Sequence, residues 1–261
     1  MSFWNTLAAE LRKTVTLPAS WAAVAVTLLG SAGITALIAV TSRAPDPGAR
    51  ESPTLGSVFE VAYAAVPLGT VGAVVFGVVV MSSEYTANSA DAGAGRQITA
   101  TLAASPHRAS LLVAKALTVV LLVVVTAAVT IPACVGVAHL IIGDAAPEGI
   151  ELDDALLRSL GATLYWTLTG LIAFAITVLT RSGIVPLVVL IANSSLVSFS
   201  LLLTKLTPVA FWLPDMAGRK LFIGLSTVEG GLDTGPGALV MGAWTLGLLA
   251  IAGAVFSRRD A

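Results

Sequence analysis

Very few side chains in this sequence could do acid–base or metal chemistry. The only histidines, His107 and His139, are too far apart for the H-E-x-x-H helix of zinc hydrolases. The single cysteine, Cys134, excludes an internal disulfide, a redox pair and a thiolate zinc cluster. No G-x-x-x-x-G-K-[ST] phosphate loop for ATP occurs in the chain. We therefore expect no catalytic residue, no metal site and no cofactor bound by this chain.

One serine run comes close to a catalytic pattern. Gly30-Ser31-Ala32-Gly33 reads G-S-A-G, whereas intramembrane rhomboid proteases need G-x-S-G, and the only candidate base would be His139. Small residues in an apolar helix more often provide a close-packing surface. A proteolytic or lipid-modifying enzyme is therefore the weakest of three functional hypotheses.

The elements that carry these residues must lie in a membrane. Hydrophobic residues make up 56% of the 261 residues and charged ones only 11%, whereas a soluble domain carries about 25% charged residues. Too few ionised side chains remain to cover a water-facing surface. The net charge of −1 gives no basic field that would attract nucleic acid.

Six stretches without a charged residue are long enough to cross the roughly 30 Å hydrocarbon layer. We predict membrane spans at about 21–40, 62–82, 116–137, 159–179, 184–203 and 237–256. If the N-terminus is cytoplasmic, the inner segments hold eight Lys and Arg residues and the longer outer segments hold six. The positive-inside rule then favours cytoplasmic N- and C-termini.

The segment before the first span, residues 1–18, has the pattern of an interfacial helix. Its apolar residues Phe3, Trp4, Leu7, Leu11 and Val15 recur at helical spacing, and Pro18 ends the segment. We expect this amphipathic helix to lie on the cytoplasmic leaflet, the alternative being a frayed, solvated terminus.

The predicted spans contain hydroxyl groups and one amide but no charge. Ion-coupled transporters usually need charged or imidazole groups at membrane depth, so an uphill transporter of this kind would take its energy from a partner. Small residues spaced four apart, as in Gly69-Ala73-Gly77 and around Gly242 and Gly247, allow close helix packing, either inside the protomer or in a dimer.

The longest inner segment, 83–115, combines an irregular polar part with a short amphipathic pattern. From Arg96 the apolar positions Ile98 and Leu102 predict a short helix that stops before Pro106. Such a helix has an apolar side to bury and a cation to present.

This segment resembles that of the integral-membrane subunits of ABC transporters, in the type-2 exporter class with the type V fold. The matching residues are Glu84-Tyr85, Gly95-Arg96, Pro106-His107-Arg108, Leu111-Leu112 and Ala114-Lys115. The chain departs from the family where ten residues separate Glu84 from Gly95, since the family usually places the glycine closer. The Ala- and Val-rich composition looks like that of an actinobacterial member.

The resemblance implies an all-α membrane protein, with the interfacial helix, six spans, a cytoplasmic coupling helix between spans 2 and 3, and a re-entrant outer element within 205–236. It also implies a dimer of permease protomers in the bacterial cytoplasmic membrane and two cytoplasmic ATPase subunits that bind ATP and Mg²⁺. The residues that would couple to the ATPase are Glu84, Arg96, Ile98, Leu102 and Arg108. The alternative for the two arginines is contact with lipid phosphates.

In this fold the substrate path is lined chiefly by spans 2 and 5. The resemblance thus points to Phe76, Asn193, Ser194, Ser198 and Phe199 as pathway residues. The amide of Asn193 needs a partner at membrane depth, and that partner could equally be a neighbouring helix. Aromatic, aliphatic and hydroxyl groups suit an amphipathic or apolar cargo, such as a drug, a peptide antibiotic or a lipid-like molecule, which would make the protein an efflux or resistance component.

A second hypothesis is a non-transporting immunity or assembly module. It would sequester a partner through the acidic outer loop 144–154 and would show no nucleotide dependence.

Overall fold

A computed structural model shows that the chain is helical. It describes residues 2–43, 58–85, 97–98, 101, 107–143, 152–194, 198–222 and 230–258, and these contain no strand. Five helices among them are long and apolar enough to cross a membrane: Pro18–Ser42, Val58–Tyr85, Arg108–Ile142, Asp153–Thr180 and Thr234–Arg258. Length and composition thus support a multi-pass membrane protein, and five predicted spans fall inside these helices.

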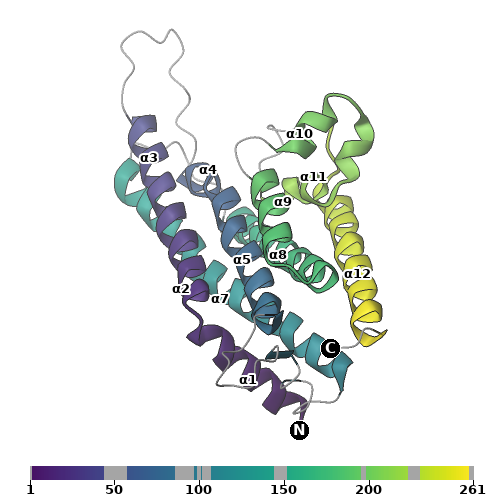
Figure 1. Ribbon diagram of the computed structural model, residues 1–261. Coiled ribbons are helices and arrows are strands. Elements are labelled where there is room, and N and C mark those ends of the chain that lie inside the picture. Colours follow the sequence, from purple (N-terminus) through teal and green to yellow (C-terminus); the bar gives the residue numbers. More distant parts are fainter. Residues whose placement is uncertain are drawn as a thin grey trace.

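The helices form one bundle (Figure 1). In its first half the elements are α1 (Phe3–Thr16), α2 (Pro18–Ala25), the π-helical turn η1 (Val26–Gly30), α3 (Ser31–Arg43), α4 (Val58–Tyr63), α5 (Val66–Ser82) and the 3₁₀ turn η2 (Ser83–Tyr85). In its second half they are α7 (Arg108–Ile142), α8 (Leu152–Thr180), α9 (Ile184–Ser194), α10 (Phe199–Thr204), η5 (Pro208–Trp212), α11 (Pro214–Ala217), η6 (Arg219–Leu221) and α12 (Thr234–Arg258).

The fifth predicted span, 184–203, does not form one membrane-length helix in the described residues. Helix α9 has 11 residues and rises about 16 Å, roughly half of the hydrocarbon thickness. A separate helix, α10, begins at Phe199 with Ser198 as its N-cap, because the Ser198 hydroxyl accepts a hydrogen bond from the Leu201 amide at 3.2 Å.

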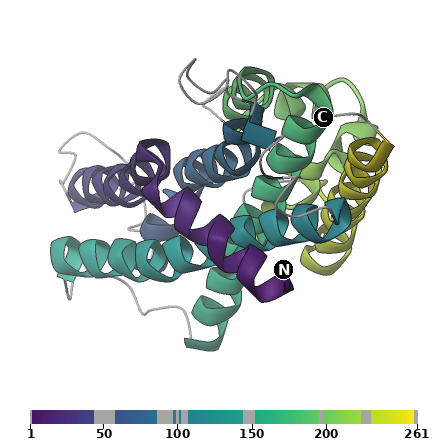
Figure 2. The same ribbon diagram turned by 60° about the horizontal axis from the view of Figure 1, so that its bottom comes forward.

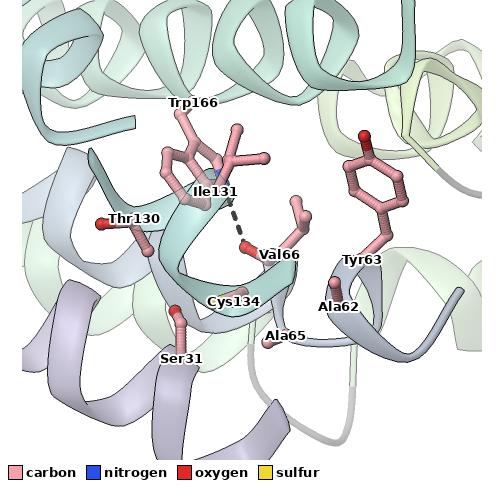
Figure 3. A pocket seen from close by; sticks show the side chains of 9 residues that line it. All are labelled: Ser31, Ala62, Tyr63, Ala65, Val66, Thr130, Ile131, Cys134 and Trp166. Atoms are coloured by element: carbon pink, nitrogen blue, oxygen red, sulfur yellow. Dashed lines mark hydrogen bonds between the residues drawn. The ribbon is translucent and has the colours of Figure 1, made fainter. Parts of the chain in front are cut away.

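Helix α5 lies at the centre of the bundle and packs most closely on α8. A Cβ at Gly77 would overlap the carbonyl oxygen of Gly170, so only glycine allows this approach. Towards the other end of α5, Trp166 is buried and its indole donates a hydrogen bond to the Val66 carbonyl at 3.0 Å (Figure 3). The predicted small-residue face of span 2 thus serves packing inside the protomer.

Helix α1 lies across one end of the bundle and contacts α7 and α5 (Figure 2). It begins after its N-cap Ser2, and it ends before Pro18 as the sequence predicts. Its buried residues are Thr6, Leu7, Glu10 and Thr14, whereas Trp4 is 71% exposed. The polar side of α1 therefore faces the protein, and the aromatic side chain faces outward.

The segment 198–222 folds into short helices at the opposite end from α1 (Figure 1). It packs on α8 and α12: the Tyr165 and Phe222 rings lie 4.9 Å apart, and a Cβ at Gly237 would overlap the Ala217 carbonyl. This short helical segment occupies the position where the sequence predicts an outer element before the last span.

Candidate functional site

A buried group of charged side chains lies where α1, α5 and α7 meet. At its centre is Glu84 in η2, directly after α5, whose side chain has no exposed surface. Its Oε1 atom lies 2.7 Å from the Nζ of Lys115, which projects from the second turn of α7. The ion pair joins the end of one predicted span to the start of the next.

The same ammonium group holds a second carboxylate. The Nζ of Lys115 also lies 2.6 Å from Oε2 of Glu10, on the inward face of α1. Both side chains are buried, with 1% and 7% of their surface exposed. Lys115 therefore connects α1 to α7 and, through Glu84, to α5.

Two further groups complete the set around Glu84. Lys13, one turn after Glu10 on α1, forms an ion pair with Oε1 of Glu84. The hydroxyl of Thr101, in the segment between α5 and α7, donates a hydrogen bond to Oε2 of Glu84 at 2.9 Å. We refer to Glu10, Lys13, Glu84, Thr101 and Lys115 as the junction network.

The junction network is electrically balanced, with two carboxylates and two ammonium groups. Buried ion pairs gain little net stability, because desolvation offsets most of the attraction, but loss of one member leaves an uncompensated buried charge. The network therefore fixes the relative positions of three segments more than it adds stability. The one hydroxyl of the network, that of Thr101, faces a carboxylate that Lys13 and Lys115 already neutralise, so the arrangement suits a mechanical role better than catalysis.

The predicted coupling residues are distributed around this network. Glu84 lies at its centre, and Ile98 is 5% exposed within the main apolar core. Arg108, at the start of α7, donates a hydrogen bond to the Phe256 carbonyl of α12 at 3.3 Å. Arg96 and Leu102 lie outside the described residues. Residues 97, 98 and 101 are helical, within the predicted range of the coupling helix.

The sequence did not indicate the network partners Glu10, Lys13 and Thr101, and it marked Lys115 only as part of a motif. A usable signal was present: Leu7, Glu10 and Thr14 share one face of α1 at helical spacing, so a carboxylate lies among residues that pack inward. An unpaired carboxylate there would be costly, which predicts a cation opposite it.

Two predicted pathway residues of the fifth apolar segment, Asn193 and Ser198, make polar contacts with Asp215 of α11. The Asn193 amide donates to Oδ2 of Asp215 at 2.8 Å, and its oxygen accepts from the Ser200 hydroxyl at 3.2 Å. The Ser198 hydroxyl lies 3.4 Å from the same Asp215 oxygen. The partner that Asn193 requires is therefore the Asp215 carboxylate of α11.

The remaining pathway residues lie in different surroundings. Phe76 of α5 is 1% exposed and belongs to the main core. Helix α9 packs on α5 through other residues, Val74 and Val78, which form a separate apolar cluster. Phe199, the first residue of α10, is 62% exposed. The side chain of Ser194 lies outside the described part of the structure. The described residues do not bring Phe76 to the polar contacts of Asn193.

No cluster of three or more His, Cys, Asp or Glu side chains suited to a metal ion occurs within the described ranges. In the comparisons with known proteins, no protein-family model matches this chain and no curated protein matches it significantly. The functional argument therefore depends on the residues and their geometry.

Proposed function

We propose that this chain is the membrane subunit of an ATP-driven exporter, a permease in which a separate cytoplasmic ATPase hydrolyses ATP. Two protomers, in a homodimer or a heterodimer, would form the pathway for an amphipathic or apolar molecule such as a drug, a peptide antibiotic or a lipid-like compound. Two ATPase subunits would supply ATP and Mg²⁺, and the complex would lie in the bacterial cytoplasmic membrane.

The junction network is the observation that best supports this proposal. An exporter of this kind must convert movement of a cytoplasmic partner into movement of membrane helices. Glu84 is bonded to α1, to α7 and to Thr101 of the segment between α5 and α7. A push on that segment or on α1 would therefore reach α5 and α7 through short, charge-assisted contacts, which hold geometry better than contacts between neutral groups.

The proposal assigns the network to the cytoplasmic side. Helix α1 and the last turn of α12 lie at the same end of the bundle, where Arg108 bonds the Phe256 carbonyl (Figure 1). This is the orientation that the Lys and Arg distribution favours. The segment 198–222 would then be the outer element, with Asn193 and Asp215 holding it to the fifth apolar segment.

The test is nucleotide-dependent transport by the purified complex. The full chain is affinity-purified from its native membrane with the ATPase subunits that accompany it, and ATP hydrolysis and vesicle transport are measured with a diverse panel of amphipathic compounds. Deletion of 96–105 should abolish stimulated hydrolysis while membrane insertion continues.

Two results would overturn the proposal. Transport by the chain alone, without an ATPase, would contradict the division of roles. A purified chain that binds a partner through 144–154 with no nucleotide dependence would support the immunity or assembly module instead.

A further inference from the structure

An apolar groove runs along the bundle surface between the first membrane helix and α7. One wall consists of α2 and η1, the other of α7, and Phe76 of α5 lies at its base. Its volume is about 250 Å³, and the wall residues include Trp21, Val24, Leu28, Leu122 and Val125. This volume is below the roughly 300–1,000 Å³ of pockets for drug-sized ligands, so the groove suits a narrow molecule.

Two buried hydroxyl groups in this groove differ from most helical threonine hydroxyls. Other helical threonines, such as Thr27, Thr126 and Thr177, donate to the carbonyl four residues earlier. Ser20 and Thr130 also line the groove and are 4% and 1% exposed, yet no group in the described residues hydrogen-bonds either hydroxyl. An unpaired buried hydroxyl is costly, so each position calls for a partner from outside the chain.

The two hydroxyls lie in different surroundings. Thr130 also borders a small cavity of about 10 Å³ that contains Ser31, whose hydroxyl likewise has no partner among the described residues. In Figure 3 the Ser31 side chain points towards the turn of α7 that carries Thr130 and Cys134. This space is close to the lower limit for one water molecule, which would bond both hydroxyls. Ser20 does not line that cavity but does line the groove.

The position of Ser20 in the chain indicates an interfacial depth. It lies in the first turn of α2, four residues after the end of α1, and amphipathic helices such as α1 lie at the boundary of headgroups and acyl chains. At the rim, the Trp21 indole donates a hydrogen bond to the Val15 carbonyl at 2.8 Å, and Trp21 is 61% exposed. Tryptophan is enriched at this depth in membrane proteins.

We propose that the groove is a binding site for one phospholipid, whose acyl chain lies between α2 and α7 and whose ester carbonyl accepts a hydrogen bond from Ser20. No charged side chain lines the groove among the described residues, so it takes an uncharged part of the lipid. The lipid holds α2 against α7 beside the junction network. This site is independent of any transport function.

The test uses a phosphatidylcholine with a diazirine near the ester end of one acyl chain. The full chain is reconstituted in nanodiscs that contain this lipid, irradiated, and its cross-linked peptides are mapped by mass spectrometry. Cross-links should concentrate on 18–28 and 122–130, above those on the equally apolar surface of α12 around Leu239, which is 77% exposed. Labelling in proportion to exposed area would overturn the proposal.

Matched variants separate the groove from the general lipid surface. Val24→Trp fills the groove and should remove its cross-links, whereas Leu239→Trp should leave them unchanged. If Val24→Trp fails to fold, Ser20→Ala preserves the shape and should lower binding about threefold to tenfold, the effect of one lost hydrogen bond. Thr130→Val should not change lipid binding, because the small cavity beside Ser31 has room for a water that would bond the Thr130 hydroxyl in place of the lipid.

A final comparison tests the carbonyl contact. The ether-linked analogue, which lacks the carbonyl, should compete more weakly than the ester lipid against the wild-type chain and equally against Ser20→Ala. Equal competition against both proteins would overturn the role of Ser20. A non-lipid molecule retained in the groove of the purified chain would overturn the choice of occupant.

Discussion

The Nζ of Lys115 lies 2.7 Å from Oε1 of Glu84, and both side chains are almost completely buried although 31 residues separate them in the chain. Lys115 reaches Glu10 with the same ammonium group, while Glu84 reaches Lys13 and Thr101. Each of these two residues therefore bridges two other segments. Movement of either α1 or the segment between α5 and α7 must displace Glu84 or break its contacts.

Replacement of Lys115 by methionine should destabilise the protein strongly. Methionine fits the space but leaves Glu10 and Glu84 without the cation between them, which costs about 3–5 kcal/mol for a buried pair. Thermal unfolding of the detergent-purified chain measures the effect. Arg258→Met, at an exposed position of α12, is the control and should unfold at nearly the wild-type temperature. Equal unfolding temperatures for both variants would contradict the assigned burial of the network.

Replacement of Lys13 by methionine should affect coupling more than stability. Lys13 is 22% exposed, and Lys115 would still neutralise Glu84, so the loss in stability should be about 1–2 kcal/mol. The contact between Lys13 of α1 and Glu84 is lost, however, and in the proposed complex with an ATPase the substrate-stimulated ATP hydrolysis should fall relative to basal hydrolysis. The neighbouring exposed Arg12, changed to methionine, should retain stimulation. Loss of stimulation in both variants would indicate a general charge effect of α1.

Sequence patterns were sufficient to predict the helices that charged residues bound at both ends. The helix predicted within residues 1–18 and five of the predicted spans correspond to described helices, because long apolar runs bounded by charges leave few alternatives in lipid. Helix α7 begins at Arg108, before the predicted start at 116, because Lys115 is paired inside the protein and does not need water. Hydropathy cannot anticipate such a compensated charge.

The fifth apolar segment shows a second limit of hydropathy. A hydropathy scale predicts one span over 184–203 because no charged residue lies there. Serine and asparagine side chains, however, can hydrogen-bond nearby backbone groups and so compete with a continuous helix. Ser198 caps α10 and Asn193 accepts from the Ser200 amide at 3.3 Å. The junction network was equally inaccessible, since the pairing of Glu10 with Lys115 joins residues 105 positions apart and depends on how α1 crosses the bundle.

Replacement of Asp215 by alanine should loosen the segment 198–222. The change removes the acceptor of the Asn193 amide and leaves that half-buried donor unpaired, at a cost of about 1–3 kcal/mol. Hydrogen exchange of the amides in 198–222 should accelerate. Asp233→Ala is the matched control, because Asp233 is 82% exposed and its ion pair with Lys220 is worth at most about 1 kcal/mol. Unchanged exchange in Asp215→Ala would show that Asn193 does not hold this segment.

Glycine substitutions should distinguish the two small-residue faces. A Cβ at Gly77 would overlap the Gly170 backbone oxygen, and the backbone cannot move aside as a flexible side chain can. Gly77→Ala should therefore lower the free energy of unfolding by about 1–3 kcal/mol or more. At Gly242 and Gly247 of α12 a Cβ meets nothing within 4 Å in the described residues. Alanine there should leave the protomer as stable as wild type or up to about 1 kcal/mol more stable, because alanine favours helix. Thermal unfolding of the monodisperse protomer in detergent measures the three variants, and destabilisation by Gly242→Ala would show that α12 packs closely on another surface.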